Sequence, residues 1–399
     1  MIERYTPFVG KGDVEEIKKL AASIRGIKVL HVNSTRIGGG VAEILYRLVP
    51  LMNDIGIETE WQVMKGDEKF FRVTKKIHNL LHLPSAESLD SADILTFLDY
   101  TYRNFEAINT EPFDVVFIHD PQPVGLIVKK KKDQKWIWRC HIDLSTPTES
   151  VWNFIKTFSS GYGASIFHIS EFVPEHMSVP AFIIPPSIDP LHDKNRDLDS
   201  DSVNAVLRKY GIDLSRPLIV QISRFDRLKD PLGAIKAYRL VKKSFDCQLT
   251  LAGSFAADDP EASQVLSEIR EEAAGDNDIF ILNLPPDSHV EINALQRSAT
   301  VVVQKSIREG FGLVVAEAMW KGKPVIGSYV GGIRRQIING LTGFFVYSTE
   351  GTAHRIKELI INKGLLAAMG ENAREQVRHN FLITRHLKDY LMVIKSMMK

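Results

Sequence analysis

The run from Ser306 to Met319, Ser-Ile-Arg-Glu-Gly-Phe-Gly-Leu-Val-Val-Ala-Glu-Ala-Met, joins a glycine turn to two carboxylates. An apolar run that we expect to be a buried strand precedes it, and after Gly310 and Gly312 the pattern becomes helical. Free backbone N–H groups at such a helix start can bind an anion, and the carboxylates of Glu309 and Glu317 can accept hydrogen bonds from sugar hydroxyls. The stretch therefore indicates half of a nucleotide-sugar site, although an ordinary helix start with two unrelated acids would look the same.

A basic cluster follows the first expected strand of the second half of the chain. The segment Ser223-Arg-Phe-Asp-Arg-Leu-Lys-Asp-Pro231 ends in an Asp-Pro pair that is typical of a helix start. The Arg224 guanidinium and the Lys229 ammonium can neutralise a diphosphate. A solvated cluster paired with neighbouring aspartates is the structural alternative. Because this segment and the Glu309 loop both end strands of one domain, we expect them to face the same cleft.

The first half begins with a similar arrangement of strand, glycines and helix. An apolar run at 28–33 leads to three consecutive glycines, Gly38, Gly39 and Gly40, and then to helical spacing over 41–49. Consecutive glycines either let the backbone approach a ligand closely or form a tight turn, and the spacing alone does not distinguish these two roles.

Polar residues end later strands of the first half. His119, Asp120 and Gln122 follow one strand, and His141 and Asp143 follow the next. A single histidine at a strand end is more often a satisfied structural residue than a ligand. Ligands nevertheless collect at the carboxyl ends of parallel strands, so several polar ends together favour a shared crevice.

The chain of 399 residues is too long for one ordinary core, which favours two domains. Apolar runs alternate with helical patterns, and this alternation implies parallel sheets with crossover helices. We expect strands at 28–33, 60–64, 114–119, 136–141, 165–170, 182–185, 218–223, 248–252, 279–282, 300–303, 324–327 and 343–346. We expect the proline-containing segment 185–190 and the polar stretch 191–202 to connect the two domains, and the tail from 353 onward to be helical.

Composition excludes several classes of function. The net charge of +1 gives no bulk field toward nucleic acid or membranes, and no apolar run approaches the ~20 residues of a membrane span. The N-terminus lacks a signal-peptide pattern. Cys140 and Cys247 are far apart and lie in strand-like runs, which indicates reduced core thiols and a cytoplasmic protein. No group of residues has the spacing of a metal site.

Three motifs of the second half together resemble a known family. They are Ser223-Arg-Phe with Lys229-Asp230, Glu309-Gly-Phe-Gly-Leu with Glu317-Ala, and Gly331-Gly332. This set is similar to the retaining glycosyltransferases of the GT-B fold. The resemblance extends over essentially the whole chain.

Further runs narrow the resemblance to the trehalose glycosyltransferring synthases, with trehalose phosphorylases as near relatives. These runs are His119-Asp-Pro-Gln122, Trp138-Arg-Cys-His-Ile-Asp143 and Arg308-Glu-Gly-Phe-Gly312. The likeness implies an α/β fold of two Rossmann-like domains whose parallel sheets face a central cleft. It implies an acceptor-side domain at 1–187, against which a helix at about 380–399 packs, and a nucleotide-sugar-binding domain at 188–379.

The resemblance also implies roles for single residues. On the donor side, Arg224 and Lys229 match the pair that holds the diphosphate and stabilises the leaving group. Glu309 matches an acid at the donor glucose, and Glu317 matches an acid at the ribose. The other residues implied at the donor nucleotide and phosphates are Gly38, Gly39, Gly40, Gly310, Phe311, Gly312, Leu313 and Val314.

On the acceptor side, His141 matches a catalytic histidine beside the transferred sugar, and Asp120 matches an acid near the acceptor. Gln122 and Asp143 are the further residues implied at the acceptor. The implied reaction is the reversible formation of trehalose, with retention, from UDP-, ADP- or GDP-glucose and glucose. The likeness implies a cytoplasmic homodimer that requires no metal or other cofactor, with Mg²⁺ at most stimulatory, and that binds neither nucleic acid nor membranes.

Alternatives from several classes stay open at this point. A trehalose phosphorylase, or a glycosyltransferase of the same type with a different acceptor, would share the motifs. A sugar-nucleotide epimerase or a nucleotide-sugar-binding protein would share the fold and differ in the reaction.

Overall fold

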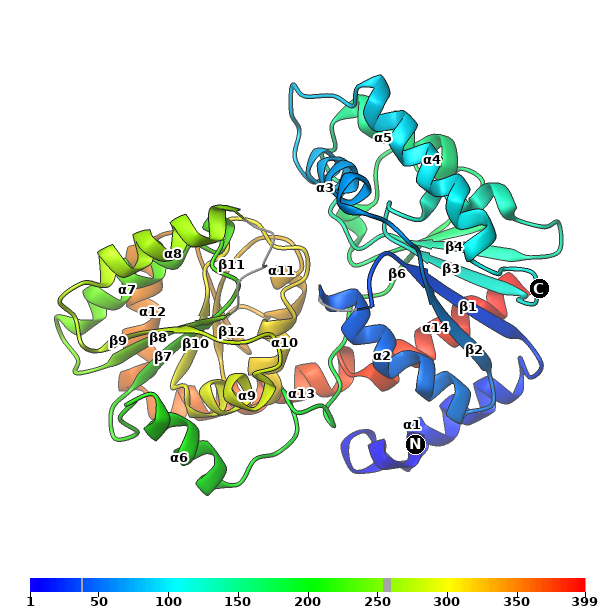
Figure 1. Cartoon of the computed structure of the whole chain (residues 1–399). Helices are drawn as coiled ribbons and strands as arrows, with labels where there is room; N and C mark the ends of the chain where they lie inside the picture. Colours follow the sequence, from blue (N-terminus) through cyan, green and yellow to red (C-terminus); the bar gives the residue numbers. More distant parts are fainter. Residues whose placement is uncertain (37–38, 254–259, 399) are drawn as a thin grey trace. The chain divides into compact units, whose positions relative to one another are not determined.

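The computed structural model describes residues 1–36, 39–253 and 260–398 (Figure 1). The chain forms two compact units, one of Met1–Ser187 with Ile383–Lys399 and one of Ile188–Leu382. The second unit is therefore continuous in sequence, whereas the first is built from both ends of the chain.

The first unit is organised around a six-stranded parallel sheet in the order β2-β1-β3-β4-β5-β6. Its strands are β1 (Lys28–Asn33), β2 (Glu58–Val63), β3 (Val115–His119), β4 (Lys135–Arg139), β5 (Ala164–Phe167) and β6 (Ala181–Ile183). Each overlaps a strand expected from the sequence. The strand order reverses direction between β1 and β3, and such a reversal is where doubly wound sheets bind their ligands.

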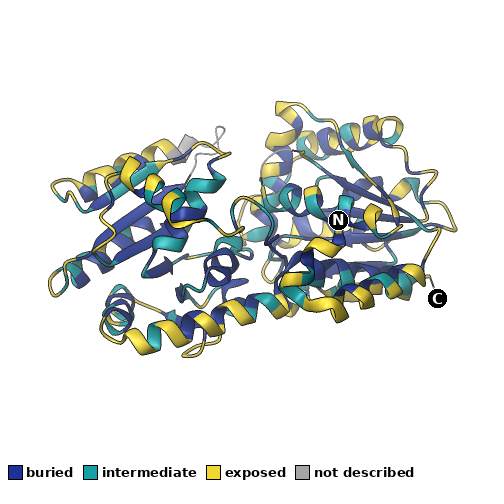
Figure 2. Ribbon diagram, turned by 90° about the horizontal axis from the view of Figure 1, so that it is seen from below, coloured by how far each residue is buried: buried dark blue, intermediate teal, exposed yellow. Residues whose placement is uncertain are grey.

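The helices of the first unit cover this sheet. They are α1 (Thr6–Ala22), α2 (Gly39–Asp54), α3 (Glu68–His82), α4 (Ser91–Ala107), α5 (Glu149–Ser159) and α14 (Ile383–Met397), with short 3-10 turns at Ile2–Tyr5, Val124–Lys129 and Ser170–Phe172. Figure 2 shows strands that are buried and helices that expose one face. The C-terminal helix α14 packs on α1 and α2, so it completes the first unit.

The second unit contains another six-stranded parallel sheet, in the order β12-β11-β10-β7-β8-β9. Its strands are β7 (Leu218–Ile222), β8 (Gln248–Gly253), β9 (Ile279–Asn283), β10 (Val301–Gln304), β11 (Val325–Ser328) and β12 (Gly343–Val346). Counted from β7, this is the order 3-2-1-4-5-6 of doubly wound nucleotide-binding folds, and its switch point lies between β7 and β10. All six strands overlap expected ones.

Helices pack on this second sheet in two layers. They are α6 (Ser200–Lys209), α7 (Pro231–Lys242), α8 (Pro260–Ala273), α9 (His289–Ser298), α10 (Leu313–Trp320), α11 (Ile333–Gln336), α12 (Thr349–Ile361) and α13 (Lys363–Asn380), with a 3-10 turn at Arg227–Lys229. Helix α7 contacts α8 and α12, whereas α10 contacts α9 and α13. Right-handed crossovers in both directions from the switch point place these two groups on opposite faces of the sheet.

The boundary between the units falls at Ser187, inside the connection predicted at 185–202. The polar part of that connection, 191–202, packs within the second unit. Asn195 is buried there, and the side-chain amide of Asn293 donates to the carbonyl oxygens of Asp193 and Arg196 at 2.8 Å each. The polar composition of this stretch thus reflects hydrogen bonds within a fold. At its other end the second unit runs to Leu382, beyond the expected 379.

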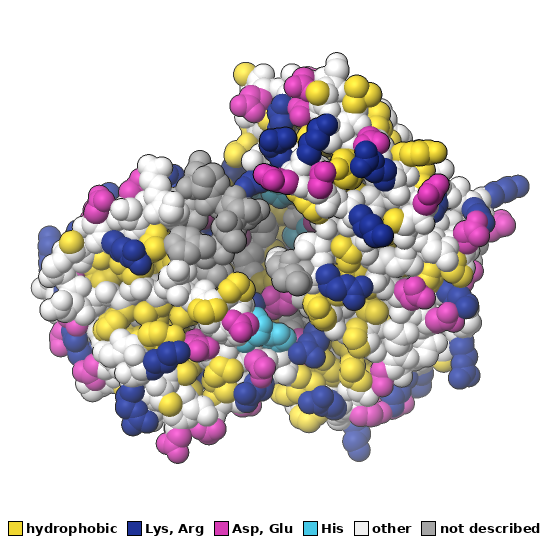
Figure 3. All heavy atoms as spheres, viewed as in Figure 1, with side chains coloured by type: hydrophobic (Ala, Val, Ile, Leu, Met, Phe, Trp, Pro, Cys, Tyr) yellow, Lys and Arg dark blue, Asp and Glu magenta, His cyan; other side chains and the backbone are white. Residues whose placement is uncertain are grey.

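Two expectations from composition can be compared with the structure. Cys140 and Cys247 are free and buried, as predicted. Among the described residues no helix is long and apolar enough to cross a membrane. Basic and acidic side chains are intermixed on the face shown in Figure 3, in keeping with the net charge of +1.

Candidate active site

The loop after β7 holds the predicted basic pair. Asp226 caps the turn Arg227–Lys229 by accepting from the backbone N–H of Leu228 at 2.8 Å. Asp230 adopts φ 48° and caps α7, accepting from the backbone N–H of Gly233 at 3.0 Å. Pro231 fills the first helical position, so the predicted Asp-Pro helix start is confirmed. This double cap fixes the backbone that carries Lys229.

Lys229 and Glu309 meet across the switch point. The Lys229 Nζ lies 2.9 Å from the Glu309 Oε1, and the two side chains are only 14% and 11% exposed. The loops that carry them follow the adjacent strands β7 and β10. As predicted, the loops that carry Lys229 and Glu309 contact each other within the second unit. Because both side chains are largely buried, solvent and salt screen this ion pair less than they screen a surface pair.

The second carboxylate oxygen of Glu309 has two further side-chain contacts. The Ser306 hydroxyl donates to Oε2 at 3.1 Å, and the Gln304 amide lies 3.5 Å from the same oxygen. The backbone N–H of Ile307 also donates to the Leu228 carbonyl at 2.7 Å, which ties the two loops together. With three hydrogen-bonding partners, the Glu309 carboxylate is fixed before any ligand arrives.

Three buried glutamines support these loops, and the sequence reading missed them. The Gln221 amide donates to the carbonyl of Lys229 at 2.9 Å, and Gln304 lies beneath Glu309. The Gln336 amide donates to the carbonyls of Phe311 and Gly312 at 2.6 and 3.2 Å. Gln221 interrupts and Gln304 ends an otherwise apolar strand, and these polar residues were the available signal.

The turn into α10 depends on glycine. Gly312 adopts φ 78° as the N-cap residue, with no side-chain cap on the helix. The first backbone N–H groups of α10, beginning at Leu313 and Val314, thus lie where an anion can bind. A Cβ on Gly331 would lie 1.6 Å from the Glu309 carbonyl oxygen, and one on Gly332 would lie 2.5 Å from the Phe311 Cα. The predicted turn at Gly310–Gly312 is therefore packed directly against the Gly331–Gly332 pair.

The other two predicted charged donor residues, Arg224 and Glu317, have ion-pair partners outside the Lys229–Glu309 pair. Arg224 is 57% exposed and lies 3.4 Å from the Asp226 carboxylate, so its guanidinium faces solvent. Glu317 is 2% exposed on α10, and the Lys194 Nζ lies 3.9 Å from its Oε1. Lys321, the residue that directly follows α10, donates to the Glu317 carbonyl at 3.0 Å. Burial lowers the pKa of Lys321, and the Glu317 charge opposes that shift.

In the first unit, the structure brings Asp120 and His141 together. The Asp120 Oδ1 accepts from the backbone N–H of His141 at 2.7 Å. Asp120 has φ 65°, a left-handed conformation that is uncommon outside glycine. Burial raises the pKa of Asp120 to about 7, while the His141 N–H and the nearby Arg139 oppose that shift.

Each ring nitrogen of His141 lies within hydrogen-bond distance of another histidine. Its Nε2 lies 3.1 Å from the His119 Nδ1, and its Nδ1 lies 3.1 Å from the His168 Nε2. Both ring nitrogens are thus occupied by other histidines.

The remaining predicted acceptor residues are near this pair in sequence. Asp143 is half-buried and accepts from the backbone N–H of Ser145 at 2.9 Å. The Gln122 Oε1 is buried and has no hydrogen-bond partner in the described part of the chain. Of the glycine run after β1, Gly38 lies outside the described residues, and Gly39, with φ 79°, and Gly40 begin α2.

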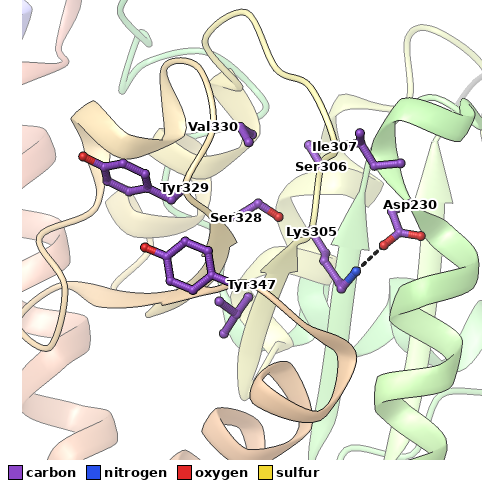
Figure 4. A pocket seen from close by; sticks show the side chains of 9 residues that line it. Asp230, Lys305, Ser306, Ile307, Ser328, Tyr329, Val330 and Tyr347 are labelled. Atoms are coloured by element: carbon purple, nitrogen blue, oxygen red, sulfur yellow. Dashed lines mark hydrogen bonds and ion pairs between the residues drawn. The ribbon is translucent and has the colours of Figure 1, made fainter.

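A separate cavity of about 240 Å³ lies beside the candidate site in the second unit (Figure 4). Lys305 points toward Asp230 and forms an ion pair with it, and Tyr329 and Tyr347 lie on the side of the cavity opposite Asp230. The rest of its lining is Ser306, Ile307, Ser328, Val330 and Val346. This lining does not include the predicted donor residues. Ser306 connects the two regions, because its hydroxyl donates to Glu309.

No group of three or more histidine, cysteine, aspartate or glutamate side chains in the described ranges is placed to hold a metal ion.

Comparison with known proteins agrees with this geometry. Residues 31–174 match the family model described as trehalose synthase, N-terminal domain, and residues 203–376 match that of glycosyl transferases group 1. The Anabaena protein HepE, solved in complex with UDP and glucose, superposes with a TM-score of 0.68 over 93% of this chain and 100% of that one. At 14% identity that likeness concerns the fold alone. The two doubly wound sheets define a glycosyltransferase of the GT-B class.

Curated relatives show which kind of glycosyltransferase this chain resembles. The trehalose synthase of Thermococcus litoralis is 43% identical over 398 residues, covering 99% of this chain and 97% of the relative. The trehalose phosphorylase of Pleurotus pulmonarius is 28% identical over 430 residues, covering 94% of this chain and 58% of the relative. The chain belongs to the trehalose synthase family. It is a trehalose-forming glycosyltransferase.

Proposed function

We propose that this enzyme transfers glucose, reversibly and with retention, from a nucleoside-diphosphate glucose to glucose, and so forms trehalose. The observation that carries the proposal is the fixed Lys229–Glu309 pair at 2.9 Å beside the uncapped start of α10. It combines a cation and backbone N–H groups for phosphate with a carboxylate for sugar hydroxyls.

In the proposed reaction, the bond between the anomeric carbon of the donor glucose and its phosphate oxygen breaks. A bond to the acceptor hydroxyl oxygen forms on the same face, and the acceptor proton passes to the departing phosphate. The negative charge on that phosphate grows in the transition state. Lys229 and the α10 N-terminus would stabilise it without rearrangement, because the caps and glutamines already fix their backbones, and the exposed Arg224 would add a second cation.

Three further predicted residues, Glu309, Glu317 and Asp120, would bind the two sugars and the ribose. Glu309 would bind hydroxyls of the donor glucose, and Glu317 would bind the ribose. Asp120 would bind the acceptor glucose, held in place by the His141 backbone. This assignment requires no metal ion at the diphosphate, because side chains neutralise it.

A product assay tests the proposed donor. The enzyme is incubated with trehalose and, in separate reactions, with UDP, ADP, GDP or inorganic phosphate, and released glucose and sugar nucleotide are measured. Glucose release that depends on a nucleoside diphosphate is expected. Release with phosphate alone would identify a phosphorylase instead. Interconversion of a sugar nucleotide without an acceptor would identify an epimerase, and nucleotide-sugar binding with no turnover would indicate a binding protein.

Glu317 distinguishes the nucleotide-dependent reaction from the phosphorylase, because a phosphorylase has no ribose to bind. The isosteric Glu317→Gln is expected to weaken binding of the preferred nucleoside diphosphate roughly 10- to 100-fold, since it removes the charge from a buried hydrogen-bonding group. Titration calorimetry measures the affinity. Glu291→Gln on α9, a carboxylate ion-paired with Lys209, is the matched control and should bind normally. Unchanged affinity in Glu317→Gln would remove Glu317 from the ribose.

A further inference from the structure

Four histidines of the first unit form one continuous chain of imidazoles. The His31 Nδ1 lies 3.0 Å from the His119 Nε2, and the His119 Nδ1 lies 3.1 Å from the His141 Nε2. The His141 Nδ1 in turn lies 3.1 Å from the His168 Nε2. These residues lie on or just after β1, β3, β4 and β5, which are consecutive in the sheet. The chain therefore runs across four neighbouring strands.

The chain is enclosed by the fold. His31, His119 and His168 are at most 4% exposed. His31 stacks on Phe117 with ring centroids 4.8 Å apart, and Tyr390 of α14 lies 5.9 Å from His31. Burial lowers the pKa of each of the four histidines, and for His119, His141 and His168 the positive charge of Arg139 adds to that shift. The imidazoles are therefore neutral at neutral pH.

Neutrality restricts how the chain can be protonated. A neutral imidazole carries one N–H, so it donates through one ring nitrogen and accepts through the other. Each of the three links joins an Nδ1 to an Nε2. All three links are hydrogen bonds only when the four rings share one tautomer, either all Nδ1–H or all Nε2–H. A ring in the other tautomer leaves at least one link with two hydrogens or with none, and an unmade buried hydrogen bond is costly.

We infer that His31, His119 and His168 are positioning residues that lock His141 in one tautomer and one ring orientation, and through the His141 backbone hold Asp120 for the acceptor sugar. The link from His141 to Asp120 is the 2.7 Å hydrogen bond from its backbone N–H. Asp120 needs such support, because its left-handed backbone at φ 65° is strained for an aspartate. The Trp138 indole N–H, which donates to the Asp120 carbonyl at 3.0 Å, is a further support. The inference rests on the proposed function, in which Asp120 binds the acceptor.

The tautomers can be observed directly. The full-length protein is labelled with ¹⁵N-histidine, and long-range ¹H–¹⁵N spectra at about pH 7.5 report the tautomer of each ring. Single histidine-to-phenylalanine variants assign the signals. The four chain histidines are expected to share one tautomer, while the exposed His176 and His354 serve as internal references. Two different tautomers among the four in the unmodified protein would overturn the inference, whatever the activity.

Kinetics test the positioning role. His119→Phe keeps an aromatic ring but cuts the chain in two, so we expect kcat/KM for the acceptor glucose to fall roughly tenfold while KM for the donor stays constant. His119→Gln, whose amide can both donate and accept, should recover part of the loss. His386→Phe is the matched control. This histidine is buried in the same unit and contacts the Pro185 carbonyl at 3.2 Å, outside the chain.

The outcomes separate the two proposals. If the enzyme uses none of the nucleoside-diphosphate glucoses, the proposed function fails, while the shared tautomer is still measurable. If the enzyme is active and His119→Phe behaves like His386→Phe, or lowers donor and acceptor parameters equally, the positioning role is overturned. If His119→Phe does not fold, the spectra of the unmodified protein still decide the shared tautomer.

Discussion

Replacing Lys229 with alanine is expected to lower kcat by roughly 10²- to 10³-fold, the range found when one preorganised group is removed from a site of developing negative charge. The ammonium is only 14% exposed and is fixed by the Glu309 carboxylate at 2.9 Å. The charge that it meets is largest in the transition state, so KM for trehalose in the reverse direction should change little. Steady-state kinetics with trehalose and a saturating nucleoside diphosphate measure both parameters.

The chain offers a matched control for this experiment. Lys305 is also a half-buried lysine in an ion pair, with Asp230, at the same end of the sheet. It lines the neighbouring cavity and is not among the predicted donor residues. Lys305→Ala should therefore retain most of the turnover. Equal losses in the two variants, or a Lys229→Ala variant that loses trehalose affinity as much as turnover, would contradict the assignment of Lys229 to the leaving group.

Lowering the pH below about 6.5 is expected to destabilise the first unit steeply. Five of its histidines, four of them buried and His141 half-buried, have lowered pKa values: that of His31 falls to about 3, and those of His119, His141, His168 and His386 fall well below their ordinary value. Burial is the main cause for all five. The fully buried Arg139 lies among the charges that add to this shift for His119, His141, His168 and His386.

The sign of this effect follows from proton counts. Below about pH 6.5 the unfolded chain binds a proton at each histidine that the folded unit keeps neutral, so each histidine costs about 1.4 kcal/mol per pH unit as the pH falls. Asp120 acts in the opposite sense. Its pKa is raised to about 7, so the folded unit keeps a proton there that the unfolded chain loses above about pH 4. A net uptake of about four protons remains, or about 5 kcal/mol per pH unit, comparable with the whole stability of a typical domain.

Urea unfolding at several pH values between about 7.5 and 5.5 measures this dependence. Tryptophan fluorescence reports mainly the first unit, which contains Trp61, Trp136, Trp138 and Trp152 of the five tryptophans in the chain. His168→Phe should reduce the slope by one proton. A free energy of unfolding that stays constant over this range would show that the histidines are not held neutral.

The sequence predicted most of the fold because its signals are local. Each strand is a short apolar run, and the cap at Asp230 with Pro231 follows from two adjacent residue types. Boundaries shifted by one to three residues where hydrogen bonding in the sheet decides the end of a strand. The boundary at Ser187 lies inside the connection predicted at 185–202, but polar composition did not reveal that 191–202 has hydrogen-bond partners on α9.

The candidate site was predictable only in part. Glycine spacing and charge indicated the loops after β7 and β10, and these loops do meet at Lys229 and Glu309. The histidine chain was not predicted, because it depends on the lateral register of strands that are distant in sequence. His31 and His168, for example, are brought into one chain only by the sheet order. The supporting glutamines were missed although Gln221 and Gln304 contact groups only 8 and 5 residues away.

The return of α14 to the first unit has a consequence for synthesis on the ribosome. Helix α14 supplies His386 and Tyr390 to the interior of a unit whose other residues are made first. The first unit therefore cannot be completed before the whole second unit has been synthesised, although N-terminal domains ordinarily fold first. Residues 188–382 can reach their final packing while the N-terminal portion still awaits its last helix, and during that interval the nascent portion exposes the apolar surface that α14 will cover.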